Sequence, residues 1–320
     1  MLRAAEVLLR GGLVAFPTET VYGLGANALD AAAVARIYAA KGRPGFNPLI
    51  VHVLNAAAAR ELAAWSPQAE ALAATFWPGP LTFVLPKRDV VPSIVTAGGA
   101  TVALRAPAHP VAQALLAAAR VPLAAPSANR STEVSPTRAE HVLRSLGGRI
   151  DLILDSGATS GGIESTVLSL VESPPRLLRP GPISIEQLEA IVGPITRPTS
   201  ATSEGETLPS PGMMPRHYAP QAMLEIAPDD GYARALELVR SRHRVGWLRF
   251  APTSGAHQPF AVERLRVYVM PRDPAGYGAM LYDTLHQLDD WGADHIVVER
   301  PPSDDAWLAI RDRLSRAAMK

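Results

Sequence analysis

The chain has 320 residues, 48% hydrophobic and 19% charged, which is enough apolar content to bury the cores of two folded domains. Its 31 basic and 30 acidic residues leave a net charge of +1, which argues against a general nucleic-acid binder. The absence of cysteine excludes disulfides, thiolate catalysis and Cys-based zinc sites. There is no uncharged apolar run of about 20 residues and no secretory h-region near the start, so we expect a cytoplasmic protein without a membrane span.

Helix and strand patterns alternate along residues 1–195 and predict a mixed α/β domain. Short apolar or β-branched runs predict its strands, at 13–16, 49–53, 81–85, 101–105, 151–155, 165–171 and 176–180. Cap residues and periodicity predict its helices, at 2–10, between Asp30 and Gly42, after Asn55, after Ser66, and at 110–120, 137–146 and 185–192. Ser184 and Gln187 have the spacing of a capping box at the start of the last helix.

Residues 196–221 differ in composition and predict a linker. They are rich in Pro, Ser, Thr and Gly, but they end in "SPGMMPRHYAP", whose Met, Arg, His and Tyr residues are typical of a segment that docks on something. A second α/β pattern covers residues 222–320 and predicts a smaller, Rossmann-like domain. Its predicted strands are 222–227, 245–250, 265–270 and 295–299, and its helices are 231–242, 275–291 and 304–317.

The segment "GLGANA", residues 23–28, matches the G-x-G-x-x-A pattern of a dinucleotide-binding turn. That mechanism requires the turn to follow a strand at once and to open a helix. Here "PTETVY" separates the predicted strand from the glycines, and the helix begins only after Asp30. No acidic residue ends the next strand, "LIVHV", as a dinucleotide site would require. We therefore interpret the segment as a Gly-rich turn that does not hold a dinucleotide.

Basic and polar residues gather between the first predicted long helix and the next strand. Lys41 and Arg43 flank the helix end, and Asn47 follows on a loop made rigid by prolines. Cations at a helix C-terminus commonly just complement the helix dipole, but two cations and an amide on one rigid loop could also grip a polyphosphate. His52 could be an ordinary buried histidine or a contact to a polar substrate. Arg105 could form a surface salt bridge or clamp a carboxylate.

Further polar loops follow buried strands. "APSANRSTEVSPT" holds Ser127, Asn129 and Ser135. It could be a purely structural polar loop in which Ser135 caps a helix, or a binding loop that follows a buried strand. "SGGIESTV" could hold an anion on backbone N–H groups near Ser165, and Arg179 in an apolar strand needs a partner such as a phosphate. No nucleophile with a matched base and no close acidic pair is evident, which is typical of a site that positions anions for phosphoryl or nucleotidyl transfer.

Six segments in order resemble the threonylcarbamoyl-AMP synthase family, whose catalytic unit is the YrdC-like domain. They are "PTETVYGLGANA", "KGRPGFNPLIVHV", "RAPAHP", "PLAAPSANRS", "GGIESTV" and "LLRPG". The likeness covers residues 1–195 nearly end to end, and "SPGMMPRHYAP" with the C-terminal α/β domain is similar to the long, two-domain form. The resemblance implies a YrdC-like twisted mixed sheet with surrounding helices for the first domain.

The resemblance also implies the reaction: L-threonine, bicarbonate and ATP give threonylcarbamoyl-AMP and pyrophosphate, with Mg²⁺ accompanying ATP. The product would pass to a separate transferase complex that modifies tRNAs reading codons that begin with A. Neither a protein metal site nor direct tRNA binding is implied, and the near-neutral charge fits an enzyme that need not hold tRNA itself.

Roles for individual residues follow from the matched motif positions. The implied threonine-binding residues are Thr20, His52, Arg105, Ala125 and Ser165. The implied ATP-binding residues are Arg43, Asn47, Thr101, Ser127, Asn129, Ser135 and Arg179, and the implied catalytic residues are Lys41 and Arg43. Arg216, His217 and Tyr218 would form a lid that excludes water from two hydrolysable intermediates.

Three alternative functions are weighed against this one. A carbamoyl-transfer role, as in hydrogenase-maturation proteins, is disfavoured because the chain has no cysteines for their zinc modules. A non-enzymatic binder of double-stranded RNA with the same fold is disfavoured by the net charge of +1. An NAD-dependent oxidoreductase is the weakest alternative, for the reasons given for "GLGANA".

Overall fold

The computed structural model describes residues 1–197, 217–251 and 263–319, and the chain divides into two compact units. The N-terminal unit comprises the described residues of Met1–Ser131 and Ser135–Met214. The C-terminal unit comprises those of Pro215–Lys320 together with Thr132–Val134. None of the helices in the described parts of the chain combines the length and apolar character needed to cross a bilayer.

The N-terminal unit is built on a nine-stranded mixed sheet with the order β7-β1-β2-β6-β3-β5-β4-β8-β9. Parallel pairs (β1 with β7, β3 with β5, β4 with β8) lie among antiparallel ones. The strands are β1 Val14–Phe16, β2 Gly23–Asn27, β3 Ile50–His52, β4 Leu81–Pro86, β5 Thr101–Arg105, β6 Leu123–Ala124, β7 Leu152–Ile153, β8 Thr166–Ser169 and β9 Arg176–Arg179. All seven predicted strands are confirmed in part, although the one predicted at 151–155 is reduced to two residues.

One segment of this sheet differs from its prediction. Residues Gly23–Asn27 form strand β2, which pairs antiparallel with both β1 and β6, so the predicted Gly-rich turn is wrong. The glycines allow close packing: a Cβ on Gly25 would lie 2.8 Å from the Phe16 ring. Glycine therefore makes room here for a neighbouring aromatic ring in the sheet.

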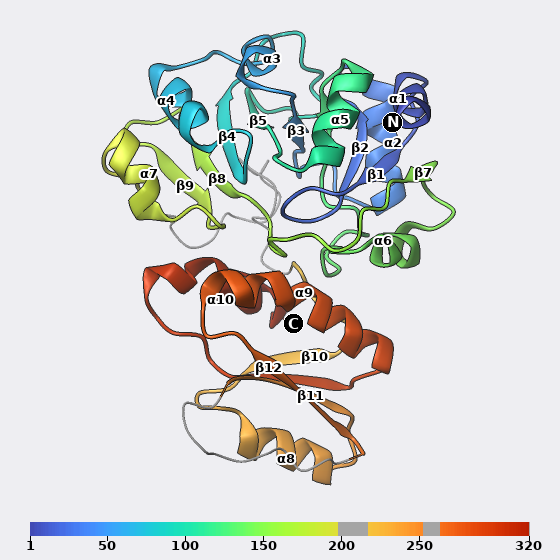
Figure 1. Cartoon of the computed structure of the whole chain (residues 1–320), viewed down its shortest axis with the longest axis vertical. Helices are drawn as coiled ribbons and strands as arrows, with labels where there is room; N and C mark the ends of the chain where they lie inside the picture. The colour runs from blue at the N-terminus through green and yellow to red at the C-terminus, as the bar shows by residue number, and fades with distance from the viewer. Residues whose placement is uncertain (198–216, 252–262, 320) are drawn as a thin grey trace. The chain divides into compact units, whose positions relative to one another are not determined.

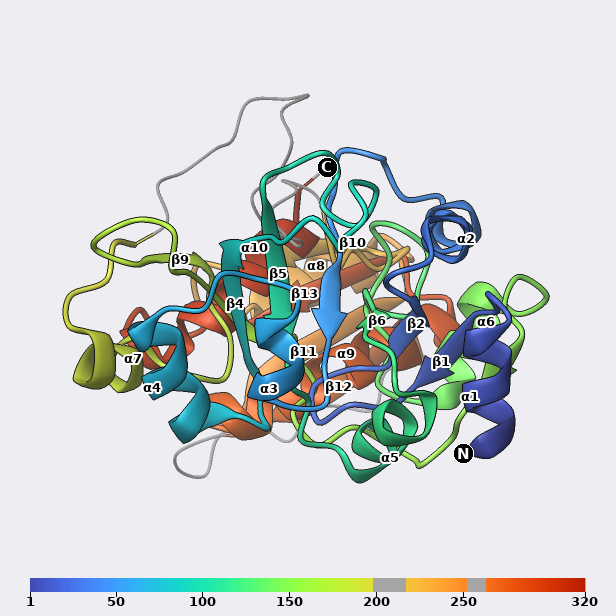
Figure 2. The ribbon, with the colours of Figure 1, turned by 90° about the horizontal axis from the view of Figure 1, so that it is seen from above.

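Helices cover the sheet, and local capping chemistry sets where they begin. They are α1 Leu2–Leu9, α2 Ala31–Lys41, α3 Ala56–Arg60, α4 Pro67–Phe76, α5 Pro110–Ala119, α6 Ala139–Leu146 and α7 Ile185–Val192. The Asp30 side chain accepts from the backbone N–H groups of Ala32 and Ala33, and Gly42 ends α2 with φ 60°. The predicted capping box of Ser184 and Gln187 is present. In Figure 2, α1, α3, α4 and α5 lie along one side of the strands, and α1 and α5 bury Leu8, Leu115 and Leu116 in one core with Phe16 of β1.

The C-terminal unit is a four-stranded parallel sheet with the order β10-β13-β11-β12. Its elements are β10 Met223–Ile226, α8 Tyr232–Arg240, β11 Val245–Phe250, β12 Leu265–Met270, α9 Pro274–Trp291, β13 His295–Val298, a 3₁₀ turn Asp305–Trp307 and α10 Leu308–Ala317. Within this unit α8 lies on one face of the sheet, and α9 and α10 lie on the other (Figure 1). Trp247 is 1% exposed and packs with Leu238 of α8 and Val297 of β13.

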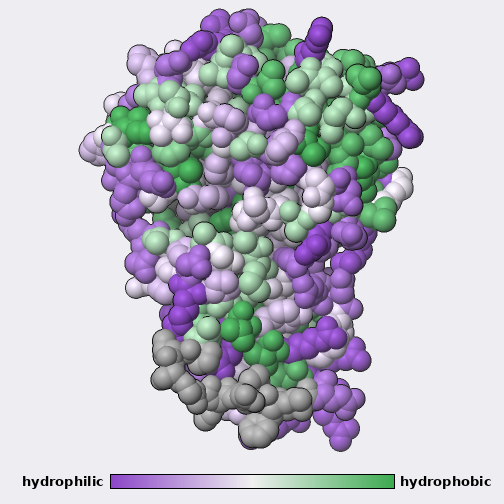
Figure 3. All heavy atoms as spheres, in the orientation of Figure 1, coloured by the Kyte–Doolittle hydropathy of each residue, from purple (hydrophilic) through white to green (hydrophobic). Residues whose placement is uncertain are grey.

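The surface of the described residues carries scattered apolar side chains. On the face drawn in Figure 3, hydrophilic and hydrophobic residues are interspersed. The most exposed large apolar side chains are Leu2 at 77%, Leu143 at 62% and Leu9 at 56%. Single exposed leucines are ordinary on soluble domains, so none of them marks a binding face by itself.

Candidate active site

Lys41 is the last residue of α2, and its ammonium group is buried in the N-terminal unit. Its side chain is 3% exposed, and Nζ donates to the backbone carbonyls of Ser127, at 2.5 Å, and Asn129. The backbone carbonyl of Lys41 in turn accepts from Ser131 N at 2.9 Å. The structure thus brings together Lys41 and the loop that carries Ser127 and Asn129, which lie more than 80 residues further along the chain.

Arg43 fastens the loop that follows α2. Its Nη2 donates to Asn47 Oδ1 at 2.6 Å and to the Pro48 carbonyl at 2.7 Å, and its Nε donates to the Asn47 carbonyl at 3.0 Å. Asn47 is fully buried, as expected for a side chain that holds a loop in place. Carbonyl and amide oxygens of the loop thus orient the buried Arg43 guanidinium.

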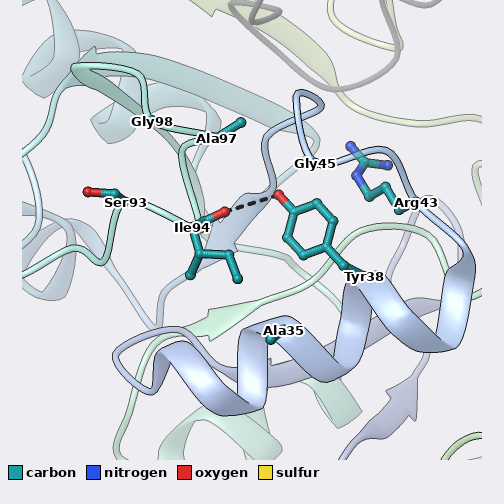
Figure 4. Close-up of a pocket in the computed structure, with 8 residues that line it drawn as sticks. All are labelled: Ala35, Tyr38, Arg43, Gly45, Ser93, Ile94, Ala97 and Gly98. Atoms are coloured by element: carbon teal, nitrogen blue, oxygen red, sulfur yellow. Dashed lines mark hydrogen bonds between the residues drawn. The ribbon is translucent and has the colours of Figure 1, made fainter.

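Tyr38 ties this loop to a second one. Its hydroxyl contacts the carbonyls of Asn47 at 3.1 Å and Ile94 at 3.0 Å, and it lies in a pocket of about 450 Å³ that Arg43 also lines (Figure 4). Burial raises the pKa of the Tyr38 hydroxyl, which therefore stays a proton donor at neutral pH. Sequence reasoning missed Tyr38, because its partners are backbone carbonyls that a sequence pattern does not reveal.

Arg105 ends β5, where it is the register partner of His52 on the parallel strand β3. Its Nε donates to the Gly79 carbonyl at 3.2 Å, its Nη1 donates to Thr20 Oγ1 at 3.0 Å, and its Nη2 lies 2.7 Å from Glu19 Oε1. The side chain is 3% exposed, so Arg105 is a buried cation and not a surface salt bridge. Sequence reasoning missed Glu19, which belongs to the quoted "PTETVY" motif.

His52 lies beside Arg105 as a neutral base. Burial, followed by the charge of Arg105, holds the pKa of His52 well below its usual value. Within the described residues its Nδ1 is buried without a hydrogen-bond partner, while the ring meets Phe16 edge to face at 6.1 Å. A buried neutral imidazole with an unused nitrogen can bind a polar group of a ligand.

Ser165, the residue before β8, meets Arg179 at the end of the neighbouring strand β9. Arg179 donates from Nη2 to Ser165 Oγ at 3.2 Å and from Nε to the Ser165 carbonyl at 3.1 Å. Ser165 Oγ also shares a hydrogen bond of 2.7 Å with Thr82 Oγ1. The structure therefore joins one residue expected on the threonine side to one expected on the nucleotide side.

Ser135 has a different role from the helix cap considered above. Its hydroxyl donates to Glu164 Oε1 at 2.5 Å, and both residues are buried. Helix α6 begins at Ala139 with Arg138 as its N-cap and no side-chain cap, so capping by Ser135 is wrong. The reason is distance along the chain: a cap accepts from N–H groups two or three residues further on, and Ser135 lies three residues before the N-cap Arg138.

Two weaker predicted residues lie at the start of β5 and directly after β6. Thr101 starts β5, four residues from Arg105, which separates the two Cα atoms by about 13 Å along a strand. Ala125 is buried, and its N–H donates to the Ile50 carbonyl at 2.9 Å. The Ala125 N–H is therefore already used in a backbone hydrogen bond to the first residue of β3.

The predicted lid residues fall partly outside the described part of the chain, since Arg216 lies there. His217 and Tyr218 belong to the C-terminal unit and are 7% and 1% exposed. Tyr218 stacks on Tyr282 at 5.7 Å, and Arg313 lies 5.1 Å from the centroid of its ring. These contacts anchor the described end of the segment to the C-terminal unit.

A second pocket of the N-terminal unit has different chemistry. It encloses about 490 Å³ between mostly apolar side chains such as Leu54, Leu116 and Val121. Glu61 and Arg120 are the charged residues among those described in its lining. Within the described ranges no group of three or more His, Asp or Glu side chains is arranged to hold a metal ion. The buried polar groups around Lys41 and around Arg105 are therefore better candidates for binding charged substrates.

Comparison with known proteins identifies relatives over the whole chain. A family model described as "Telomere recombination" matches residues 6–181, and one described as "Threonylcarbamoyl-AMP synthase, C-terminal domain" matches residues 183–319. The threonylcarbamoyl-AMP synthase of Bacillus subtilis (strain 168) is 44% identical over 99% of this chain and 92% of its own length. That of Schizosaccharomyces pombe is 40% identical over 95% of this chain and 84% of its own length.

The solved structures agree with the sequence relatives. The crystal structure of P. abyssi Sua5 complexed with L-threonine matches with a TM-score of 0.90 and 41% identity, over 99% of this chain and 93% of that one. A nucleotide-bound HypF structure matches at 24% identity, with a TM-score of 0.51, and at that level the likeness concerns the fold alone. The predicted fold class, a large mixed sheet with helices and a smaller α/β domain, is confirmed.

Proposed function

The chain belongs to the threonylcarbamoyl-AMP synthase family, and we propose that the buried polar residues of its N-terminal unit form the active site. The enzyme combines L-threonine, bicarbonate and ATP into threonylcarbamoyl-AMP and releases pyrophosphate. The relatives reported above are named as synthases, which favours this activity over the RNA-binding alternative.

One observation carries the assignment of the site. Four cationic side chains, those of Lys41, Arg43, Arg105 and Arg179, are at most 9% exposed within one unit. Burying a charge is costly unless it is compensated, and an anionic substrate that reached these side chains would add to that compensation. The substrates supply such anions: a triphosphate, an amino-acid carboxylate and bicarbonate.

The nucleotide and its phosphates would contact the residues around the end of α2. Lys41 and Arg43 would stabilise charge on the α-phosphate as the carbamate oxygen attacks and pyrophosphate leaves. Asn47, Thr101, Ser127, Asn129, Ser135 and Arg179 complete the proposed nucleotide set. We expect Mg²⁺ to arrive on the triphosphate oxygens, which are the ligands it prefers.

Threonine would occupy the neighbouring group, with its carboxylate on Arg105. Thr20 orients the Arg105 guanidinium, and the neutral His52 offers Nδ1 to a polar group of the substrate. Ala125 and Ser165 complete this proposed set. The neutral amine of threonine attacks the carbon of bicarbonate, and water leaves to give a carbamate. A carbamate oxygen then attacks the α-phosphorus of ATP, and pyrophosphate leaves. Positioning and charge stabilisation suffice for both steps, so no covalent protein intermediate is required.

Two further roles extend this proposal beyond the site. We propose that Arg216, His217 and Tyr218 form a lid that protects the carbamate and the mixed anhydride from water. The product then passes to a separate transferase complex that modifies tRNA, and the net charge of +1 supports an enzyme that leaves tRNA binding to that complex.

The test is pyrophosphate release from ATP and Mg²⁺ by the purified full-length chain. We expect release that requires both L-threonine and bicarbonate, and a product that contains both AMP and threonine by mass spectrometry. Release that ignores threonine would contradict the proposal, as would folded protein that shows no release.

A further inference from the structure

We propose that Glu19 binds the α-ammonium group of the amino-acid substrate, so that Glu19 and Arg105 together recognise the zwitterionic head group. This inference rests on the proposed function, because it takes Arg105 as the partner of the substrate carboxylate. It assigns a specificity role to a residue that sequence reasoning left without one.

The Glu19 carboxylate oxygens are buried beside Arg105, although the side chain as a whole is partly exposed. It is 16% exposed, and its Oε1 lies 2.7 Å from Arg105 Nη2. At that separation the two groups attract as charges, yet both Glu19 oxygens and this Nη2 are buried without an aligned hydrogen bond in the described parts of the chain. A buried carboxylate without aligned donors is costly, and a ligand that brings donors removes that cost.

The backbone holds Glu19 in place. Its carbonyl accepts from Gly161 N at 2.8 Å and from Ser160 Oγ at 3.3 Å. A Cβ on Gly161 would come within 2.7 Å of that carbonyl oxygen, so only glycine permits this approach. The carboxylate is thus presented from a fixed point of the chain, as a binding residue needs to be.

The charged and titratable neighbours of Glu19 suit an incoming cation. Arg105 is already held by Gly79 and Thr20 through two other nitrogens, so its orientation does not depend on Glu19 alone. His109 also interacts with Glu19, but burial lowers its pKa and keeps the imidazole neutral near pH 7. An α-amino acid carries one negative and one positive group on the same carbon, and this adjacent cation and anion match both.

Two other roles for Glu19 make different predictions. If Glu19 only orients Arg105, its loss weakens every ligand that has a carboxylate. If Glu19 occupies the place of the substrate carboxylate, its loss strengthens threonine binding. A ligand that keeps the carboxylate and lacks the ammonium separates these roles from the proposed one.

The experiment measures binding of L-threonine and of 2,3-dihydroxybutanoate, in which a hydroxyl replaces the ammonium, by calorimetry on the full chain. Glu19→Gln should weaken threonine binding by roughly 10- to 100-fold, the loss of one charge-assisted hydrogen bond. It should change the affinity for the dihydroxy acid by less than about 2-fold, which is under about 0.5 kcal/mol, because that ligand has no ammonium group for Glu19 to bind. Glu61→Gln removes an equal charge from an exposed site of the same unit and should behave as wild type.

Each other outcome overturns a specific claim. Equal weakening of both ligands by Glu19→Gln would show that Glu19 acts through Arg105, and unchanged or tighter threonine binding would exclude contact with the ammonium. Wild-type protein that binds no threonine would overturn the proposed function itself. If Glu19→Gln unfolds, Glu19→Asp replaces it: the charge remains, and threonine should still be preferred, by a smaller ratio than in wild type.

Discussion

The buried cations of the two units have different neighbours. In the C-terminal unit Arg313 is fully buried, its Nη1 lies 2.7 Å from Asp312 Oδ2, and its guanidinium covers the Tyr218 ring. In the N-terminal unit backbone carbonyls hold Lys41, and carbonyl and amide oxygens hold Arg43. The contacts of Arg313 include a carboxylate and an aromatic ring of its own unit, whereas those of Lys41 and Arg43 include loop oxygens that fix where the two charges lie. The comparison predicts that cations of the first kind control stability and those of the second kind control activity.

The largest expected effect is on Lys41. Lys41→Met should lower the rate of pyrophosphate release by roughly 1000-fold, about 4 kcal/mol, because it removes a preorganised charge from the reacting phosphates. Stopped pyrophosphate assays at saturating threonine measure this. Lys87→Met, which removes a partly exposed lysine of the same unit, is the control and should retain activity. Activity within 3-fold of wild type in Lys41→Met would break the comparison.

Arg313→Met should act on stability instead. It breaks a buried ion pair and should lower the free energy of unfolding by about 3 kcal/mol, at the lower end for such pairs because Arg316 still contacts Asp312. Urea unfolding measures the loss. Arg234→Met breaks the half-exposed pair with Glu225 and should cost under about 1 kcal/mol. The rate per folded Arg313→Met molecule should equal that of wild type, and a lower rate would assign this arginine to activity.

Arg105→Ala tests a cation that has both kinds of partner. Its removal should raise the KM for threonine by roughly 100-fold, the loss of a charge-assisted pair with a carboxylate. The KM for ATP should change much less. Steady-state kinetics with each substrate varied in turn measures both constants, and an unchanged KM for threonine would refute the carboxylate assignment.

His52 gives the N-terminal unit a pH-dependent stability. Since burial lowers its pKa, the folded unit keeps His52 neutral, while the unfolded chain takes up a proton below about pH 6.5. Stability is therefore present above that pH and falls by about 1.4 kcal/mol per unit as the pH decreases below it. Urea unfolding at pH 7.5, 6.0 and 5.0 measures the slope. His52→Gln should flatten it, and an unchanged slope would assign it to other groups.

Tyr38→Phe should have the smallest effect. It removes one hydroxyl that contacts two loop carbonyls, worth about 1 kcal/mol of stability, and it should raise the KM for ATP severalfold by loosening the Arg43 loop. Thermal unfolding and ATP-dependent kinetics measure the two effects. Tyr268→Phe, whose hydroxyl contacts the exposed Gln287 in the C-terminal unit, is the control and should change neither.

The sequence predicted well those features that depend on near neighbours in the chain. The Asp30, Ser66 and Ser184 caps lie where expected, because a cap needs only backbone N–H groups two or three residues further on. Strand β2 was missed because glycine usually indicates a turn. The reason for glycine in this strand is the nearby Phe16 ring, and that contact is visible only in the fold.

The site shows the same limit. Its basic loops were visible as motifs, but the contacts of Lys41 with Ser127 and of Arg105 with Glu19 join segments some 86 residues apart. Ser135 was interpreted through its adjacent helix, whereas its partner Glu164 arrives from another loop. Chemistry of single residues can thus be read from the sequence, and their pairing requires the fold.

The length of helix α2 sets the position of the Lys41 side chain. The helix starts at the Asp30 cap and ends at Lys41 before the left-handed Gly42, so its length fixes where the ammonium group points. One inserted residue would turn Lys41 by about 100° and move it about 1.5 Å along the axis, away from both carbonyls that hold it. Insertions should therefore be tolerated in the exposed turn at 89–90 but not between Ala31 and Lys41. In protein engineering, this helix should be kept at constant length.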